Sequence, residues 1–163
     1  MIEKIVTIGV YGFAEAEFFD ALQQASVDVF CDVRQRRGVR GATYAFANSQ
    51  RLQARLAELG IHYLYRKDLA PTTAVRQQQK TADRTSKVAK RQRDQLSQDF
   101  IEAYGAEILS QFEPQSLLDE LPPTAKVVAL FCVEREPAAC HRSLVAQKLA
   151  QTFNVPIIDI RPE

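Results

Sequence analysis

The sequence predicts an α/β fold: a single three-layer domain with a mostly parallel sheet of about five strands and helices on both faces. Short β-branched runs alternate along the chain with stretches that have apolar residues at helical spacing, which is typical of parallel sheets. The chain has 163 residues, about the length of one domain. Its 46% hydrophobic and 25% charged residues are typical of a soluble globule. We therefore expect one domain over residues 1–163.

The first half of the chain alternates three expected strands with two expected helices. The opening run, KIVTIGV, is rich in β-branched residues and is followed by apolar residues at helical spacing. The second helix places three leucines on one face, begins after a capping Asn or Ser and ends at a glycine. The expected elements are strand 4–10, helix 14–24, strand 27–33, helix 49–59 and strand 61–65.

The second half repeats this alternation after a basic segment. An amphipathic pattern predicts a helix over 99–112, and a shorter helix is expected over 116–121 before two prolines. The run over 127–132 is the most apolar and suits a strand in the middle of a sheet covered on both faces. A helix over 140–153 and a strand over 155–160 complete the predicted fold.

Charge is strongly segregated along the chain. Residues 34–93 contain fifteen Lys or Arg and three acids, a net charge of +12, so the rest carries −11. Clustered cations attract phosphates, and nearby Tyr44 and Phe46 are candidates to stack on bases. We expect residues 66–95, most of which belong to this segment, to form a basic loop or arm, with a mostly solvated helix, inserted in the domain. The expected nucleic-acid contacts are Arg36, Arg37, Arg40, Lys80, Arg84, Lys87, Lys90, Arg91 and Arg93.

Several classes of protein are disfavoured by the sequence. The longest apolar run, residues 127–133, is far shorter than a membrane span, which needs about 18 residues or more. The start of the chain lacks the pattern of a secretory signal, and three cysteines fit reduced thiols, so we expect a cytoplasmic protein with no membrane partner. No glycine-rich phosphate motif of an ATPase or a dinucleotide dehydrogenase is present, and the sequence leaves the cofactor unknown.

The chemistry is expected where the strands end. Ligands of parallel α/β sheets bind at the carboxyl ends of the strands. Tyr11 follows the first strand, Asp32 and Arg34 the second, and Cys132 and Glu134 the fourth. The loop after the fourth strand then leads to Cys140, His141 and Arg142 at a helix start. A helix start holds anions and lowers the pKa of a nearby thiol, so these groups form a chemically competent set.

We assign provisional roles to these residues. The expected catalytic residues are Cys132 or Cys140 as nucleophile and Glu134 or Asp32 as proton carriers. The expected substrate-binding residues are Arg34, His141, Arg142, Tyr11 and Arg37. Simpler interpretations stay open: Cys132 also fits a core thiol, and Asp32 with Arg34 also fits an internal ion pair that fastens the loop. Cys31 is expected to be packing.

Three functions follow from this pattern. The first is an enzyme, or a degenerate enzyme, that binds and processes an anionic, phosphate-bearing substrate such as a nucleotide or nucleic acid. The second is a non-catalytic nucleic-acid-binding module that uses residues 34–93. The third is a metal or redox site made from Cys132, Cys140 and His141, which lack the paired C-x2-C spacing of structural zinc sites and would need a further ligand.

Four segments, taken in order, resemble domain-of-unknown-function family 488. They are Thr7-Ile8-Gly9, Asp32-Val33-Arg34, Gly60-Ile61-His62-Tyr63 and the C-x7-C-H-R segment from Cys132 to Arg142. The resemblance spans nearly the whole chain and implies a single α/β domain in bacteria or archaea. It implies little about the reaction. Its motif carries onto Asp32, Arg34, Cys132, Glu134, Cys140, His141 and Arg142.

The chain departs from this family at one place and has a second, weaker likeness. Leu69-Ala70-Pro71 stands where members of the family often have Leu-Gly-Gly, which puts a shared binding loop in doubt. Asp-Val-Arg after a strand and Arg142-Ser143 at a helix start are similar to rhodanese domains. The span from Cys132 to Arg142, however, is longer than a rhodanese loop and contains two glutamates and no glycine, so sulfur transfer is only an analogy.

Overall fold

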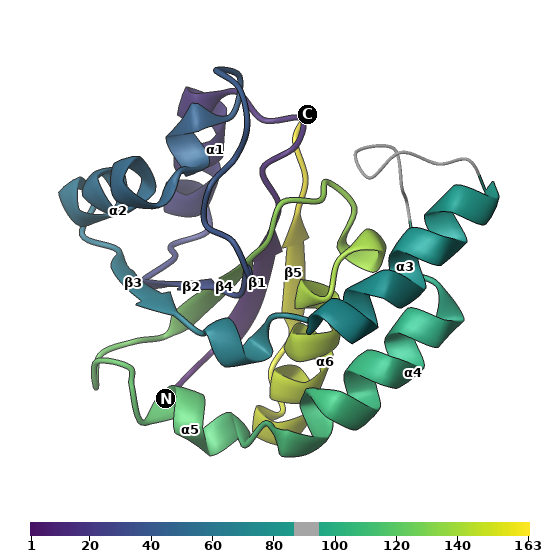
Figure 1. Cartoon of the computed structure of the whole chain (residues 1–163). Helices are drawn as coiled ribbons and strands as arrows, with labels where there is room; N and C mark the ends of the chain where they lie inside the picture. Colours follow the sequence, from purple (N-terminus) through teal and green to yellow (C-terminus); the bar gives the residue numbers. More distant parts are fainter. Residues whose placement is uncertain (87–94) are drawn as a thin grey trace.

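A five-stranded sheet forms the centre of the computed structural model, which describes residues 1–86 and 95–163 (Figure 1). The strand order is β3-β2-β4-β1-β5, and each neighbouring pair is parallel. The predicted parallel sheet is therefore confirmed. The strands are β1 (Lys4–Ile8), β2 (Val29–Asp32), β3 (His62–Tyr65), β4 (Val127–Phe131) and β5 (Ile157–Ile160).

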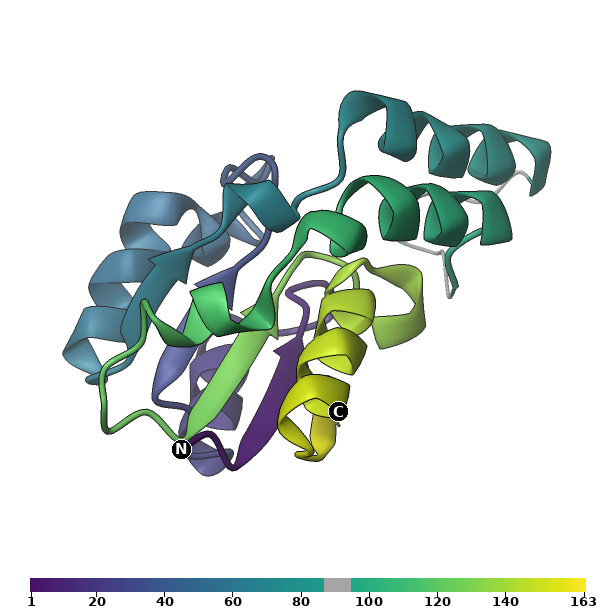
Figure 2. The ribbon, with the colours of Figure 1, turned by 90° about the horizontal axis from the view of Figure 1, so that it is seen from below.

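Helices cover both faces of the sheet, which confirms the three-layer α/β fold. Helices α1 and α2 lie on one face and α5 and α6 on the other, while α3 and α4 run side by side at the end of the domain (Figures 1 and 2). No helix among the described residues is long and apolar enough to cross a membrane. The helices are α1 (Glu15–Gln24), α2 (Ser49–Glu58), α3 (Thr73–Ser86), α4 (Gln98–Glu107), α5 (Pro114–Leu118) and α6 (Arg142–Phe153).

The core is centred on β4, the most apolar strand. All five residues of β4 are buried, as expected for a central strand covered on both faces. Phe131 packs against Phe30 of β2, with ring centroids 4.9 Å apart, and against Phe18 of α1 at 5.7 Å. Cys31 of β2 is fully buried in the same core, as expected of a packing thiol.

Two segments differ in detail from the prediction. The expected helix over 99–112 ends as α4 at Glu107 and tightens into a 3-10 turn, Leu109–Gln111, where Lys148 of α6 donates a hydrogen bond to the Leu109 carbonyl. The basic segment 66–95 begins with a 3-10 turn, Lys67–Leu69, and continues as the helix α3. Val75 and Gln79 of α3 are buried, so one side of this helix is part of the packed structure.

The direction in which the chain leaves the sheet changes at β4. The chain leaves β1 and β2 toward α1 and α2 on one face, and it leaves β4 toward α6 on the opposite face. The loops on either side of this point diverge, which is the place where parallel sheets bind ligands. The carboxyl end of β4 is therefore where a site is expected.

Candidate functional site

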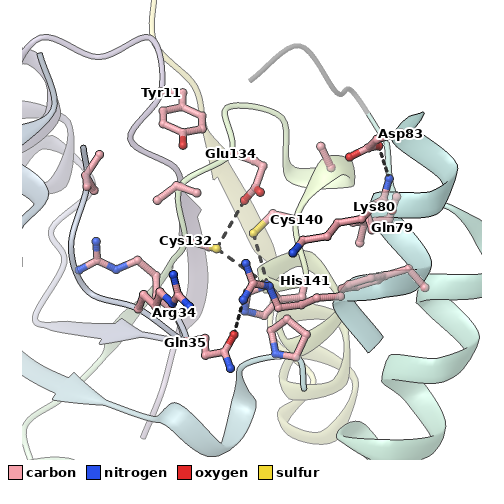
Figure 3. Close-up of a pocket in the computed structure, with 18 of the residues that line it drawn as sticks. Tyr11, Arg34, Gln35, Gln79, Lys80, Asp83, Cys132, Glu134, Cys140 and His141 are labelled. Atoms are coloured by element: carbon pink, nitrogen blue, oxygen red, sulfur yellow. Dashed lines mark hydrogen bonds between the residues drawn. The ribbon is translucent and has the colours of Figure 1, made fainter. Parts of the chain in front are cut away.

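A cavity of about 520 Å³ lies at this edge of the sheet (Figure 3). It is lined by the loops that follow β1, β2 and β4 and by side chains of α3 and α4. Its wall contains six of the nine candidate catalytic and substrate-binding residues: Tyr11, Arg34, Cys132, Glu134, Cys140 and His141.

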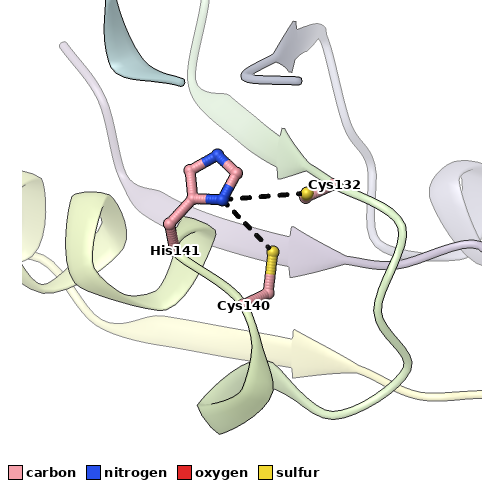
Figure 4. A group of neighbouring side chains, drawn as sticks. All are labelled: Cys132, Cys140 and His141. Atoms are coloured by element: carbon pink, nitrogen blue, oxygen red, sulfur yellow. Dashed lines mark hydrogen bonds between the residues drawn. The ribbon is translucent and has the colours of Figure 1, made fainter. Parts of the chain in front are cut away.

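The buried part of the cavity lining, here called the floor, consists of the Cys132 and Cys140 thiols, the His141 imidazole and the Glu134 carboxylate. The two thiols and the imidazole lie together (Figure 4). The Nδ1 atom of His141 lies 3.9 Å from the Sγ atom of Cys132 and 3.8 Å from that of Cys140. The exposed fractions are 6% for Cys132, 1% for Cys140 and 6% for His141. These groups come from the end of β4 and from the start of α6, where His141 is the N-cap residue. The eight-residue separation of the cysteines in sequence is closed by the loop between them.

The His141 ring is held in one orientation. Its Nε2 atom lies 2.8 Å from the carbonyl oxygen of Val33, in the loop after β2. A carbonyl only accepts hydrogen bonds, so Nε2 carries a hydrogen and Nδ1 is directed at the sulfurs. The ring of Tyr104 in α4 packs against the imidazole, with centroids 5.6 Å apart. The loop after β2 and α4 together position the imidazole.

The environment favours a charged thiolate and imidazolium. Burial raises the pKa of the Cys140 thiol, but the hydrogen bond from Cys132 and the charge of His141 outweigh it and hold this pKa well below its usual range. Burial lowers the pKa of His141, but the Cys140 thiolate and the hydrogen bond to Val33 raise it above its ordinary value. Each charge of the pair stabilises the other in the interior.

Arg142 holds the backbone of the loop that carries Glu134. The guanidinium of Arg142 is fully buried and donates hydrogen bonds to the carbonyl oxygens of Glu134, at 2.6 Å, and Arg135, at 3.3 Å. The Glu134 side chain turns the other way, and its Oε2 accepts a hydrogen bond from the Cys132 thiol at 3.5 Å. We expected Arg142 to bind substrate, but among the described residues it is not part of the cavity wall. Its contacts make it a positioning residue.

Asp32 and Arg34 form a buried ion pair, one of the two interpretations left open by the sequence. The Arg34 guanidinium donates two hydrogen bonds to the Asp32 carboxylate, at 2.9 and 2.8 Å, and a third to the carbonyl of Ala47. The hydroxyl of Tyr63 donates to the same carboxylate at 2.7 Å. Asp32 is fully buried and is not among the described cavity residues, whereas Arg34 is. This arrangement fastens the loop after β2.

The mouth of the cavity is cationic. Arg36 and Arg40 line it from the loop after β2, and Arg76 and Lys80 line it from α3. Lys80 is labelled in Figure 3. Arg76 was not predicted from the sequence, although its spacing of four residues from Lys80 places both on one side of a helix. Arg37 was expected there, but its guanidinium lies over the ring of Tyr65, 4.2 Å from the centroid, and it is not among the described cavity residues.

Two expected base-stacking residues have other surroundings. Phe46 is 3% exposed and packs on Phe18 with ring centroids 5.5 Å apart, so its expected role in stacking on bases is wrong. Tyr44 is half-buried against Tyr11, with ring centroids 5.3 Å apart. Of the remaining cations expected to contact nucleic acid, Arg84 is exposed on α3, whereas Lys87, Lys90, Arg91 and Arg93 lie outside the described residues.

Comparison with known proteins identifies the family. The family model described as domain of unknown function DUF488 matches residues 15–149. The chain belongs to this family. The match includes the thiols, the imidazole and the cations of the cavity mouth, and it confirms the resemblance carried by Asp32-Val33-Arg34 and by the Cys132 to Arg142 segment. No curated protein and no solved structure matches the chain.

Proposed function

We propose that this DUF488 protein binds a phosphate-bearing substrate, a nucleotide or the end of a nucleic acid, in the cavity and acts on it at the floor. One observation carries the proposal: a cationic mouth and a floor with two thiols, an imidazole and a carboxylate line the same cavity. The mouth would hold the phosphates, and the floor would supply the chemistry.

The charges of the wall favour an anionic ligand. Five cations line the cavity, and the described wall contains two acids, Asp83 and Glu134. Arg34 is neutralised by Asp32, so the excess rests on the cations of the mouth. Guanidinium groups donate paired hydrogen bonds to phosphate oxygens. Arg36, Arg40, Arg76 and Lys80 are therefore the proposed phosphate-binding residues, in place of Arg37 and Arg142.

The dimensions suit a small molecule or a chain end. Ligand pockets commonly have volumes of about 300–1,000 Å³, and this cavity falls within that range. A longer nucleic acid would have to continue outside the cavity, where Arg84 is exposed on α3. The proposed catalytic residues are Cys132, Cys140 and Glu134, with Glu134 as the proton carrier. Asp32 is withdrawn from this set because its carboxylate is occupied by Arg34 and Tyr63.

Calorimetric titration with inorganic pyrophosphate and with ATP tests the proposal. Arg76→Gln removes one cation of the mouth and is expected to weaken binding about tenfold, the equivalent of one charge-assisted hydrogen bond. Arg51→Gln, an exposed residue of α2 that is not among the described cavity residues, is the matched control and is expected to leave binding unchanged. Equal affinities for wild type and Arg76→Gln, or no binding of either probe, would contradict the proposal.

The alternative, a non-catalytic nucleic-acid-binding module, is supported by the exposed cations Lys80 and Arg84 of α3. Such a module would bind a single-stranded oligonucleotide with an affinity that falls steeply with salt, because each phosphate contact releases counterions. His141→Ala separates the two functions. A module would show no turnover in the wild type and would keep its oligonucleotide affinity in His141→Ala. The enzyme would show turnover in the wild type and would lose it in His141→Ala.

A further inference from the structure

We propose that Cys132, Cys140 and His141 bind one zinc ion, with a fourth coordination position that faces the cavity. The inference deepens the proposed function, because its catalytic consequence rests on a substrate bound in the same cavity. The occupancy of the site does not depend on that substrate.

The three candidate ligand atoms lie close together. All lie within 4.8 Å of one another, and the two sulfur-to-nitrogen distances are 3.9 and 3.8 Å. A tetrahedral zinc ion with bonds of about 2.3 Å to sulfur and about 2.0–2.1 Å to nitrogen needs sulfur-to-nitrogen distances of about 3.5 Å and a sulfur-to-sulfur distance of about 3.8 Å. The sulfur-to-nitrogen distances therefore need to shorten by a few tenths of an ångström, and the two sulfurs need to approach by at most about 1 Å.

The orientation of His141 is the one that a metal ligand needs. A ligating histidine usually donates its second ring N–H to a carbonyl or carboxylate, which fixes the tautomer and directs the other nitrogen at the metal. Nε2 of His141 makes this contact with the Val33 carbonyl at 2.8 Å, and Nδ1 faces both sulfurs. Val33 belongs to a different segment from the ligands, so the supporting contact is independent of them.

The backbone around the ligands is held by the sheet and its loops. The Cys132 amide donates to the Ile8 carbonyl of β1 at 3.4 Å, and the Cys140 amide donates to the Pro137 carbonyl at 3.2 Å. Two sulfurs and one imidazole are soft or intermediate ligands, which select zinc over magnesium or calcium. All three residues line the cavity, which is why the proposed fourth position is placed on the side of the group that faces it.

Three protein ligands and an accessible position are typical of a catalytic zinc site. Glu134 lines the same cavity, and its Oε2 is 3.5 Å from the Cys132 sulfur. A zinc ion held by the three residues would supply Lewis-acid activation of a water at neutral pH. Glu134 would take a proton from the attacking water as its oxygen bonds to the electrophilic atom of the substrate, and would pass this proton to the leaving group. The overall reaction is hydrolysis, with water as the co-reactant.

Elemental analysis of the full chain, purified without added metal or chelator, tests the site. We expect about one zinc per chain in the wild type and a loss of zinc in Cys140→Ala and His141→Ala. Cys31→Ala, which removes a buried thiol from the adjacent strand β2, is the matched control and is expected to retain zinc. Zinc content of the wild type no higher than that of Cys140→Ala, even after incubation with zinc sulfate and desalting, would overturn the proposal.

Cobalt substitution keeps the test valid if a cysteine variant fails to fold. Wild-type protein loaded with Co²⁺ is expected to show sulfur-to-cobalt charge-transfer absorption and the visible bands of a tetrahedral ion, both of which zinc abolishes. Absence of the charge-transfer absorption would overturn the proposal without any substitution. Glu134→Gln is expected to retain the metal; loss of metal from this variant would show that Glu134 is a ligand and that no open position exists.

The two proposals fail in different ways. Pyrophosphate binding that is weakened by Arg76→Gln in a protein that never binds zinc would sustain the proposed function and overturn the metal site. A stoichiometric zinc ion in a protein that binds neither pyrophosphate nor ATP would sustain the metal site and overturn the proposed function.

Discussion

Gly9 and Glu134 touch through their backbones: a Cβ atom at Gly9 would lie 1.7 Å from the carbonyl oxygen of Glu134. That carbonyl also accepts the hydrogen bond from Arg142, whose Nη1 atom would lie 3.0 Å from the same Cβ. The end of β1, the loop after β4 and the start of α6 therefore meet at one point with no room for a side chain. The position of Glu134 at the cavity depends on this contact.

Gly9→Ala is expected to displace the loop that carries Glu134. The added methyl group would clash with backbone atoms, which cannot rotate away, so the free energy of unfolding should fall by about 1–3 kcal/mol. Urea denaturation measures this change. Gly105→Ala is the control, because no atom lies within 4 Å of its Cβ position in α4, and there alanine is expected to leave stability equal or higher. Equal stability of wild type and Gly9→Ala would refute the close contact.

Arg142→Lys tests whether Arg142 positions the loop or binds ligand. Lysine keeps the charge but loses the two directed hydrogen bonds to the carbonyls of Glu134 and Arg135, so stability should fall by about 1.5–3 kcal/mol. Arg161→Lys, an exposed cation, is expected to change stability by less than about 0.5 kcal/mol. Unchanged stability with a loss of pyrophosphate binding would restore Arg142 to the ligand-binding role expected from the sequence.

Asp32→Ala leaves the buried guanidinium of Arg34 without its carboxylate partner. Breaking a buried pair in this way costs about 3–5 kcal/mol, which thermal or urea denaturation would detect. Glu15→Ala removes an ion pair of similar length, with Arg51, on the exposed surface and should cost less than about 1 kcal/mol. A stable Asp32→Ala protein that has lost turnover would instead place Asp32 among the catalytic groups.

The titration of Tyr63 makes the free energy of unfolding depend on pH in the alkaline range. Burial and the negative charge of Asp32 raise the pKa of Tyr63 to about 12, compared with about 10 in an unfolded chain. Between these values the unfolded chain releases a proton that the native protein retains, so stability falls as the pH rises. Tyr63→Phe is expected to reduce the slope of the free energy of unfolding against pH, measured by urea denaturation between about pH 10 and 12. Tyr11→Phe is the comparison variant. An identical slope in wild type and Tyr63→Phe would exclude a raised pKa of Tyr63 in the native protein.

The strands and their order along the chain were predictable because each has a local pattern. The run that became β4 is apolar throughout, and the helix α2 has its leucines on one face between a capping residue and a glycine. The approach of Cys132, Cys140 and His141 to one edge was also inferable, because carboxyl ends of parallel strands converge. Which of Arg36 and Arg37 lines the cavity could not be predicted, because adjacent residues of a loop have no periodicity that assigns them to one side.

By itself, the sequence determined the alternation of strands and helices, the segregation of positive charge and the set of thiol, imidazole and carboxylate groups at the loop after β4. Only the tertiary structure decided which of these groups face the cavity. Arg142 points inward because the carbonyls of Glu134 and Arg135 must be paired below the loop, and the Arg34 guanidinium binds Asp32 because the two are buried together. The orientation of His141 was decided by the Val33 carbonyl, 108 residues away in the chain, and no local pattern encodes so distant a hydrogen bond.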